Sequence, residues 1–264
     1  MISVTLMGRM GNNLFQIASG LCLAKKHNTV LHIPIPSWNN TAYSYLNCFK
    51  MMDVHFGNPA SMVYKEQHFF YNELFDILPD NVHLYGYFQS EKYFKSYESL
   101  IRSNFEFNDT VVQSTKAKLD TYDIDYKEAT AIHLRRTDYL TIQHAHPIPS
   151  LDYYKDGLKL MNAKNVIVFS DDIEWCRANI KIEGINFIFS DMPQEETICA
   201  MTMVKNLVIA NSTFSWWGAW LNKHPEKQVV YPKQWFGNTL PYRELDINHE
   251  VCTKDIPCAG WIGL

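Results

Sequence analysis

Two kinds of apolar segment are missing from this sequence. No stretch of about 18 consecutive apolar residues occurs, which excludes a transmembrane helix of ordinary length. The N-terminus also lacks the uninterrupted apolar run of a secretion signal, because Gly8, Arg9, Gly11, Asn12 and Asn13 break it. We therefore expect a cytoplasmic protein.

Residues with the spacing of metal ligands are also missing. The six cysteines are scattered and form no C-x-x-C motif, so buried thiols explain them better than zinc ligands or disulfides. His144 and His146 are close in sequence, but their loop is bounded by prolines and offers no cysteine or carboxylate to complete a site. We expect neither a metal site nor a cofactor.

The signatures of the common nucleotide-binding folds are absent as well. Gly8 and Gly11 form G-x-x-G instead of the dinucleotide motif G-x-G-x-x-G, and Pro34, not an acid, follows the second predicted strand. No P-loop motif occurs. The formal charge is −4, from 24 basic and 28 acidic residues, and no basic run interleaves with aromatics. These features argue against a nucleic-acid surface and leave a small nucleotide as an open alternative.

The chain has enough apolar sequence for one large domain or two ordinary ones, since 47% of its 264 residues are hydrophobic and 14% are aromatic. Apolar strands alternate with segments of helical periodicity, which predicts an α/β protein. The polar, turn-prone segment 122–127 separates two βαβ halves, so we expect domains at 1–126 and 127–264. The predicted strands are 2–7, 30–33, 82–88, 129–135, 166–169, 186–189 and 206–210, and the main predicted helices are 14–27, 109–120, 152–161 and 194–204.

Between residues 36 and 75 the periodicity is weak and aromatic residues such as Trp38 and Tyr71 are frequent. We expect irregular structure that walls a cleft. Aromatic faces beside amides suit sugar rings, while the alternative is that these rings only fill the core. Asn12 and Asn13, at the start of the first helix, could likewise present amides to a sugar or phosphate, or could belong to a plain tight turn.

The most informative stretch is AIHLRRTDYL at residues 131–140. An apolar strand leads directly into charged residues, and open α/β sheets bind ligands at the carboxyl ends of their strands. The adjacent Arg135 and Arg136 favour an anion such as a diphosphate; the alternative is that they pair with Asp138 and other surface acids. Because side chains alternate along a strand, we expect His133 and Arg135 on one face, and Leu134 and Arg136 on the other.

Two later strands also end in polar groups. Asp171 and Asp172 follow one of them. The spacing of Asp171 and Glu174 predicts a capping box at a helix start; the alternative is that this carboxylate binds a ribose or a guanine edge. After another strand, Asn211 to Phe214 begin an aromatic helix, whose first N–H groups can bind an anion.

Six stretches form a set in a fixed order along the chain. They are GRMGNNLFQIASGLCLAKK (8–26), GYFQSEKYF (86–94), HLRRTDYL (133–140), SLDYY (150–154), VFSDDIEW (168–175) and NSTFSWWGAWL (211–221). Together they resemble the bacterial α-1,2-fucosyltransferases of glycosyltransferase family 11. The H-x-R-R-x-D stretch is shared with α-1,6- and O-fucosyltransferases and indicates GDP-fucose, whereas the last stretch narrows the resemblance to family 11.

The resemblance implies an α/β fold of the GT-B type, with two Rossmann-like domains facing a central cleft. The first domain would lie on the acceptor side and the second would bind the donor. The implied reaction is metal-independent, inverting transfer of L-fucose from GDP-β-L-fucose to the 2-hydroxyl of a β-galactoside-terminated glycan. A bacterial surface polysaccharide is the expected product, and a lipid-linked acceptor would associate the enzyme weakly with the inner face of the cytoplasmic membrane.

The resemblance also implies roles for residues. Arg135 and Arg136, with backbone N–H groups of residues 212–214, would stabilise the leaving GDP, and Asp138 would act as the base or orient the arginines. The expected donor-binding residues are His133, Arg135, Asp171, Asp172, Asn211, Ser212, Thr213 and Phe214, and the expected sugar- or acceptor-binding residues are Gly11, Asn12, Asn13 and Gln16.

Three departures from the family pattern concern the acceptor. The family usually has Gln at the position of Asn13 and Gly at that of Thr137, and the chain is short for the family. The alternatives are a fucosyltransferase of another linkage, a protein O-fucosyltransferase and a catalytically silent sugar-binding protein. The arginine pair argues against the silent protein, and the missing signal and disulfide-type cysteines argue against the protein O-fucosyltransferase.

Overall fold

The computed structural model of the protein describes residues 1–34, 43–237 and 253–264. The described chain divides into two compact units. Unit 1 comprises residues 1–108 and 253–258, and unit 2 comprises residues 109–237 and 259–264. Trp38, one of the aromatic residues expected near a sugar, lies outside the described residues.

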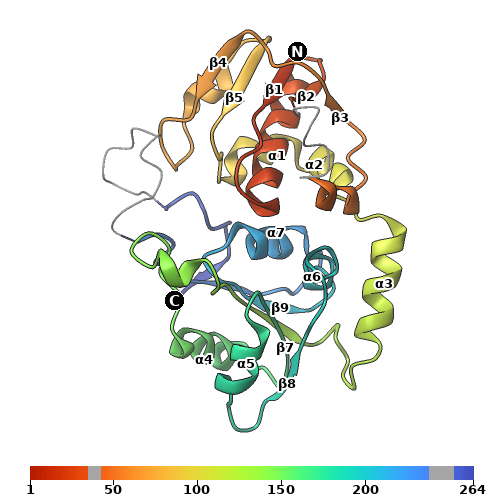
Figure 1. The fold of residues 1–264 in the computed structure, drawn as a ribbon, viewed down its shortest axis with the longest axis vertical. Coiled ribbons are helices and arrows are strands. Elements are labelled where there is room, and N and C mark those ends of the chain that lie inside the picture. Colours follow the sequence, from red (N-terminus) through yellow and green to blue (C-terminus); the bar gives the residue numbers. More distant parts are fainter. Residues whose placement is uncertain (35–42, 238–252) are drawn as a thin grey trace. The chain divides into compact units, whose positions relative to one another are not determined.

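Unit 1 is built on a parallel sheet with the strand order β3-β2-β1-β5-β4 (Figure 1). Helix α1 contacts β1 and β2 and is buried along most of its length, and Lys25 and Lys26 complement the negative end of its dipole. The strands are β1 (Ile2–Val4), β2 (Leu31–Ile33), β3 (Val54–Phe56), β4 (Met62–Lys65) and β5 (Val82–Tyr85). The helices are α1 (Met10–Lys26) and α2 (Glu98–Asn104), with 3₁₀ helices η2 (Ser44–Cys48), η3 (Glu73–Ile77), η4 (Glu91–Tyr93) and η5 (Lys95–Tyr97).

Strands β3 and β4 lie between residues 36 and 75, where the sequence predicted irregular structure. The prediction was wrong for these two strands. They are the edge strands of the sheet, and side chains such as Phe56 (73% exposed) and Val63 (59% exposed) face solvent. An edge strand with little burial lacks the alternation of apolar and polar residues by which a half-buried strand is recognised.

Unit 2 contains a parallel sheet with the strand order β11-β10-β9-β6-β7-β8. The direction of strand succession reverses at β6, because β7 and β8 follow on one side and β9 to β11 on the other. Ligands of open α/β sheets bind at such a switch point. The strands are β6 (Thr130–Leu134), β7 (Asn165–Ser170), β8 (Asn186–Phe189), β9 (Asn206–Val208), β10 (Val229–Tyr231) and β11 (Ile262–Gly263). The helices are α3 (Asp109–Leu119), α4 (Leu151–Leu160), α5 (Ile173–Asn179), α6 (Gln194–Met201) and α7 (Thr213–Leu221), with the 3₁₀ helix η6 (Tyr139–Thr141).

Helices cover both faces of the unit 2 sheet (Figure 1). On one face, α4 and α5 pack over a core that includes Ile132, Leu134 and Leu158. On the other face lie α6 and α7, and the indoles of Trp216 and Trp217 are fully buried. Strands covered on both faces carry nearly continuous apolar runs, which is why β6 and β7 were predicted correctly from the sequence.

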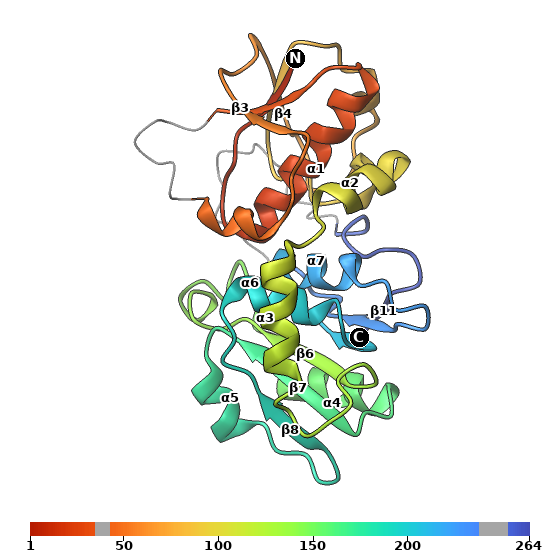
Figure 2. The same ribbon diagram turned by 90° about the vertical axis from the view of Figure 1, so that its right-hand side faces the viewer.

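Helix α3 belongs to unit 2, so the units divide between residues 108 and 109 and not after residue 126 as predicted. The helix packs along α6 (Figure 2), where Leu119 is buried and Lys118 pairs with Asp191 at 3.0 Å. The sequence periodicity shows that this helix has an apolar face, but it does not show which neighbour covers that face.

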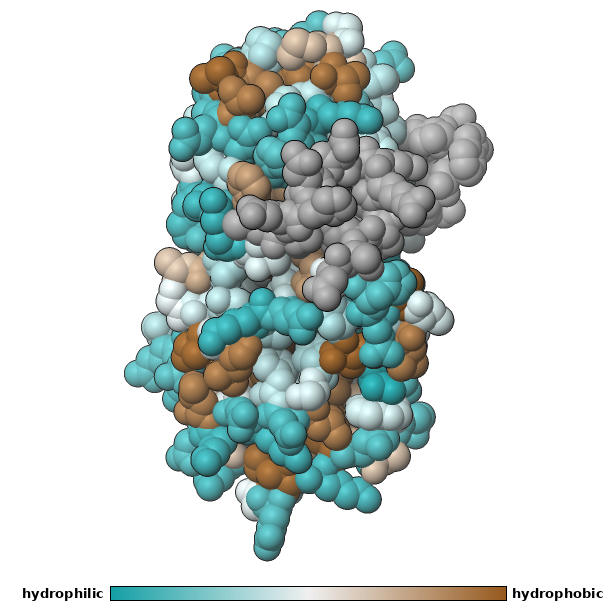
Figure 3. Space-filling view, turned by 90° about the vertical axis from the view of Figure 1, so that its left-hand side faces the viewer, coloured by the Kyte–Doolittle hydropathy of each residue, from teal (hydrophilic) through white to brown (hydrophobic). Residues whose placement is uncertain are grey.

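Within the three described stretches of the chain, no helix is both long and apolar enough to cross a membrane. On the face drawn in Figure 3, hydrophobic groups form small patches that alternate with hydrophilic ones. Scattered exposed apolar side chains are ordinary on protein surfaces, so these patches do not by themselves mark a binding site.

Candidate functional site at the carboxyl edge of the second sheet

The carboxyl end of β6 brings the H-x-R-R-x-D residues to the switch point of the unit 2 sheet. Leu134 points into the core beneath α4, whereas His133 contacts Phe214 of α7, with ring centroids 5.6 Å apart. Arg136 lines a pocket together with Leu134. The guanidinium carbon of Arg135 lies 5.8 Å from the centroid of the Tyr139 ring, whose hydroxyl donates to the Asn211 carbonyl oxygen just before α7. These contacts agree with the predicted alternation of the four side chains.

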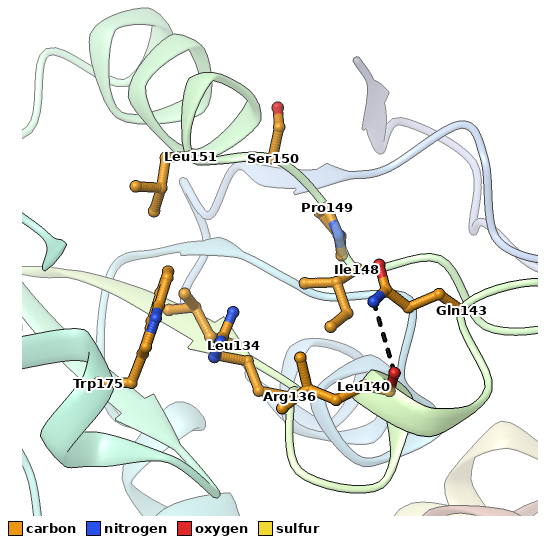
Figure 4. Close-up of a pocket in the computed structure, with 9 residues that line it drawn as sticks. All are labelled: Leu134, Arg136, Leu140, Gln143, Ile148, Pro149, Ser150, Leu151 and Trp175. Carbon is orange, nitrogen blue, oxygen red and sulfur yellow. Dashed lines mark hydrogen bonds between the residues drawn. The ribbon is translucent and has the colours of Figure 1, made fainter.

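A pocket of about 280 Å³ opens beside Arg136 on the face that α4 and α5 cover (Figure 4). Its wall is largely apolar, and the amide of Gln143 is turned toward the carbonyl oxygen of Leu140 at 3.5 Å. The lining residues are Leu134, Arg136, Leu140, Gln143, Ile148, Pro149, Ser150, Leu151 and Trp175.

Arg136 is fixed on this side of the sheet by two contacts. Its guanidinium carbon lies 3.4 Å from the centroid of the Trp175 ring, and its Nε is 3.2 Å from a carboxylate oxygen of Asp172. Only 12% of the arginine side chain is exposed. A guanidinium group stacked on an indole and paired through Nε has little freedom to reorient.

Asp172, not Asp171, is the N-cap of α5. Its carboxylate accepts a hydrogen bond from the backbone N–H of Trp175 at 3.4 Å, in addition to the contact with Arg136. The capping box predicted for Asp171 and Glu174 is therefore wrong by one residue. The sequence places two aspartates in succession, and only the backbone turn after β7 decides which of them caps the helix.

Arg135 is held between two carboxylates. Its Nη2 is 2.8 Å from Asp138, its Nη1 is 3.1 Å from Asp171, and its guanidinium carbon lies 5.8 Å from the centroid of the Tyr139 ring. The pairing with acids that the sequence left as an alternative is thus present. It occupies two of the five N–H donors of Arg135, so the guanidinium group keeps donors for a further anion.

Asp171 contacts the backbone of the segment that follows β6. Its carboxylate accepts hydrogen bonds from the N–H groups of Arg136 at 2.8 Å and Thr137 at 3.2 Å, and from the Thr137 hydroxyl. Asp171 therefore connects the end of β7 to the loop that carries the arginines.

His133 is nearly inaccessible, with 6% of its surface exposed. Burial lowers its pKa to about 4, the negative charge of Asp171 opposes this shift, and the positive charge of Arg135 adds to it. The imidazole is therefore neutral near pH 7. Its Nδ1 has no hydrogen-bond partner among the described residues, and a buried polar atom of this kind requires one.

The segment between β9 and α7 makes hydrogen bonds within the protein, whereas the sequence predicted that it contacts the donor. The Asn211 side chain donates hydrogen bonds to the carbonyl oxygens of Pro147 at 2.8 Å and Trp235 at 2.9 Å, so it joins two loops. The N–H group of Ser212 donates to the Ala210 carbonyl oxygen at 2.7 Å and is not available to an anion. Thr213 and Phe214 form the first turn of α7, and Ser212 makes no side-chain cap there.

In unit 1, Asn13 and Gln16 are fully buried and serve the fold. The Asn13 amide donates to the Met7 carbonyl oxygen at 2.9 Å, and the Gln16 amide donates to the Gly86 carbonyl oxygen at 2.9 Å. Gly11 is likewise buried within α1. These placements differ from the expected contacts with a sugar.

Asn12 is the partly exposed member of the set expected to bind a sugar. Its Oδ1 accepts a hydrogen bond from the Gln89 side chain at 3.1 Å. Gln89 follows β5, so this bond joins the first turn of α1 to the segment after the strand that neighbours β1. Asn12 is therefore the amide best placed to reach a ligand.

Glu66 is a buried carboxyl group in unit 1. It accepts hydrogen bonds from the N–H groups of Tyr87 at 2.6 Å and Phe88 at 3.0 Å, and burial raises its pKa to about 7 against the lowering effect of these bonds. It lies in the weakly periodic segment, where no sequence pattern distinguishes it from a surface acid.

The described residues contain no group of three or more His, Cys, Asp and Glu side chains placed to hold a metal ion. The cationic groups at the carboxyl edge of unit 2 are Arg135, on the side of His133 and the first turn of α7, and Arg136, which is stacked on Trp175 of α5. Guanidinium groups and a helix N-terminus are suited to an anionic ligand at this edge.

Comparison with known proteins identifies the family. Residues 1–238 match the sequence model of Glycosyl transferase family 11. The chain belongs to glycosyltransferase family 11. This match includes most of both compact units and all six stretches that carry the resemblance.

Curated relatives in the family include three informative proteins. O-antigen biosynthesis glycosyltransferase WbnK of Escherichia coli is 32% identical over 62% of this chain and 58% of its own length. An alpha-1,2-colitosyltransferase of Escherichia coli is 28% identical over 88% of this chain and 91% of its own length. Galactoside 2-alpha-L-fucosyltransferase SEC1 of Bos taurus is 22% identical over 83% of this chain and 64% of its own length. The chain thus spans less than two thirds of WbnK and of SEC1.

Solved structures show the fold. POFUT1 in complex with GDP-fucose superposes with a TM-score of 0.53 at 12% sequence identity, over 87% of this chain and 97% of that chain. Both units described above contain a parallel sheet with helices, as the GT-B class requires. The predicted class of two Rossmann-like domains is confirmed.

Proposed function

We propose that the chain is a galactoside 2-α-L-fucosyltransferase, which transfers L-fucose from GDP-β-L-fucose to the 2-hydroxyl of a terminal β-galactoside with inversion. The observation that carries the proposal is the placement of Arg135 beside the buried, neutral His133 at the switch point of the unit 2 sheet. The names of SEC1 and of the POFUT1 complex support the acceptor linkage and the donor. The name of WbnK supports a product in bacterial surface polysaccharide.

The leaving group is the part of the reaction for which unit 2 is best equipped. When the bond between the fucose anomeric carbon and the diphosphate breaks, its electron pair moves onto a β-phosphate oxygen. The remaining N–H donors of Arg135 and the positive end of the α7 dipole would stabilise that charge as it forms. Fixed donors of this kind reduce the need for a divalent cation.

His133 supplies a contact for the nucleoside end of the donor. Its Nδ1 lacks a protein partner among the described residues, so a donor hydroxyl or ring nitrogen would complete its hydrogen bonding. Because the imidazole is neutral, one ring nitrogen can accept while the other donates.

The acceptor side requires a base and a group that orients the galactoside. Asp138 is our candidate base, because its carboxylate is 39% exposed beside Arg135 and can take the proton of the attacking 2-hydroxyl. We propose that unit 1 forms the acceptor side and that Asn12 contacts the acceptor, since its amide is partly exposed at the carboxyl edge of that sheet.

A second candidate differs in the donor. The alpha-1,2-colitosyltransferase matches most of both chains, which favours GDP-colitose as an alternative. Colitose lacks the 3-hydroxyl of fucose and is otherwise the same sugar. A site built to hydrogen-bond that hydroxyl rejects the deoxy sugar strongly, whereas an apolar site rejects the hydroxyl only weakly.

Both candidates are tested by one assay. GDP release is measured with GDP-fucose, GDP-colitose and GDP-mannose, each with and without lactose, and the linkage of the product is determined by NMR. Lactose-dependent release from GDP-fucose, with the galactose 2-position substituted, is the expected result. Faster transfer from GDP-colitose would favour the second candidate, substitution at another hydroxyl would overturn the linkage, and binding without lactose-dependent release would indicate a silent sugar-binding protein.

A further inference from the structure

Asp171 is surrounded by hydrogen-bond donors of the protein itself. Its Oδ1 accepts from the N–H of Arg136 at 2.8 Å. Its Oδ2 accepts from the N–H of Thr137 at 3.2 Å and from the Thr137 hydroxyl, and lies 3.1 Å from Nη1 of Arg135. A carboxylate offers about two lone pairs on each oxygen; three protein donors converge on Oδ2 and one on Oδ1, so only one lone pair, on Oδ1, is left. Little capacity remains for the ribose or guanine contact that the sequence predicted.

The register of the sheet explains why these donors converge on one side chain. Leu134 at the end of β6 pairs with Ser170 at the end of β7, so the next residues in register are Arg135 and Asp171. As the two parallel strands end together, Asp171 reaches the turn formed by residues 135–137. Only 18% of its side chain is exposed, so water competes weakly with its contact to Arg135.

We propose that Asp171 is a positioning residue, which fixes the guanidinium group of Arg135 and the following backbone for contact with the donor β-phosphate. The inference rests on the proposed function, because it assumes a GDP-sugar donor. Without Asp171, the more exposed Asp138, 39% exposed and 2.8 Å from Nη2, would be the remaining partner of Arg135 and would draw it away from the donor. Asp171 thus acts through Arg135 and does not touch the nucleoside.

A comparison of GDP with GMP separates this role from a nucleoside contact. GMP carries the guanine, the ribose and one phosphate but lacks the β-phosphate. If Asp171 positions Arg135, Asp171→Asn should weaken GDP binding by about tenfold, the loss of one charge-assisted hydrogen bond, and change GMP binding by less than about twofold. Calorimetry with each nucleotide measures the two dissociation constants.

Steady-state kinetics with GDP-fucose give a second readout. Asp171→Asn should lower kcat by about 10²-fold, as expected when a stabiliser of developing charge is displaced. Asp171→Glu keeps the carboxylate and should recover part of the loss. In an Arg135→Ala background, Asp171→Asn should cause little additional loss, because the residue through which it acts is absent.

The matched control is Asp152→Asn, which changes an aspartate that is 83% exposed in the first turn of α4 and should leave all these quantities unchanged. Equal weakening of GDP and GMP by Asp171→Asn would overturn the inference and restore a nucleoside contact. Additive losses in the double variant would overturn it as well, since they indicate a general structural role. A wild-type protein that binds neither nucleotide would instead overturn the proposed function.

If Asp171→Asn does not fold, Thr137→Val provides a second variant. It removes one of the four donors to Asp171 and should weaken GDP binding by a smaller factor than Asp171→Asn, again without changing GMP binding.

Discussion

Arg136 lies on the Trp175 indole with its guanidinium carbon 3.4 Å from the ring centroid, while its neighbour Arg135 lies on the other side of the strand between Asp138 and Asp171. Two arginines that are adjacent in sequence therefore have different surroundings. Arg136 is fixed to α5, whereas Arg135 belongs to the side that His133 and α7 share. This difference separates a structural arginine from one that can act on the donor.

The first prediction is that Arg135→Lys lowers kcat by at least about 10²-fold with the fold intact, because lysine keeps the charge but loses the forked geometry. Arg136→Lys should affect kcat less and should instead lower the free energy of unfolding by about 1 kcal/mol through loss of the stacked contact. Steady-state kinetics and urea unfolding of both variants measure the two effects.

The exposed pair of Lys155 and Asp152 in α4 provides a control, because Lys155→Arg should change neither quantity. If folded Arg135→Lys retains more activity than Arg136→Lys, the roles of the two arginines are reversed. The pocket beside Arg136 would then become the better candidate for the donor diphosphate.

The second prediction concerns pH and Glu66. Burial raises its pKa from 4.5 to about 7. Because the folded protein holds the neutral carboxyl group, this group contributes its full stabilisation at pH values below the pKa of the unfolded chain, and the contribution is lost as pH rises through about 7. The linked free energy is about 3 kcal/mol. Glu66→Gln does not titrate, so its free energy of unfolding relative to wild type should rise from about pH 5 to about pH 8.

Urea unfolding at several pH values measures this difference. Glu106→Gln alters an exposed carboxyl group, which is 58% exposed, and is the matched control whose difference from wild type should stay nearly constant. A constant difference for Glu66→Gln as well would show that Glu66 is not held neutral in the folded protein. The turn at Tyr87 and Phe88 would then be held by an ionised carboxylate.

The third prediction is that chelation by EDTA leaves the transfer rate nearly unchanged. In the described parts of the chain, no His, Cys, Asp and Glu cluster is placed to hold a metal, and Arg135 is available to meet the diphosphate charge. Rates measured after dialysis against EDTA check this. A rate that falls sharply and returns with Mg²⁺ or Mn²⁺ would show that the arginines do not suffice.

The sequence predicted the strand and arginine pattern of β6 because both depend on local rules. Burial on both faces gives a continuous apolar run, and side-chain alternation places Arg135 and Arg136 on opposite sides. Helix α1 was predicted within a few residues for the same reason, since its apolar positions have helical spacing.

The features that the sequence did not predict depend on long-range contacts. The tertiary fold sets three of these features. Helix α6 packs against α3, Glu66 is buried beneath residues 87–88, and β3 and β4 are exposed edge strands. Asp172 and not Asp171 caps α5 because of the backbone conformation after β7, which the sequence does not reveal. The same applies to Asn13, since an amide at a helix start looks identical in sequence whether it binds a sugar or a backbone carbonyl.

The last prediction follows from this difference between neighbouring asparagines. Asn12 is partly exposed and bonds to Gln89, whereas Asn13 is fully buried and bonds to the Met7 carbonyl and the Gln16 side chain. Asn12→Ala should therefore raise the KM for the acceptor by about tenfold, the loss of one hydrogen bond to a ligand, and leave the KM for the donor nearly unchanged.

Asn13→Ala should have the opposite pattern. Removing its amide leaves buried groups without partners, which costs about 1–3 kcal/mol of unfolding free energy, while the KM for the acceptor of the folded fraction should change little. Acceptor kinetics with lactose and urea unfolding of the two variants distinguish the outcomes. A larger change of acceptor KM in Asn13→Ala than in Asn12→Ala would mean that the first turn of α1 rearranges when the acceptor binds, because the Asn13 amide is inaccessible in the conformation described.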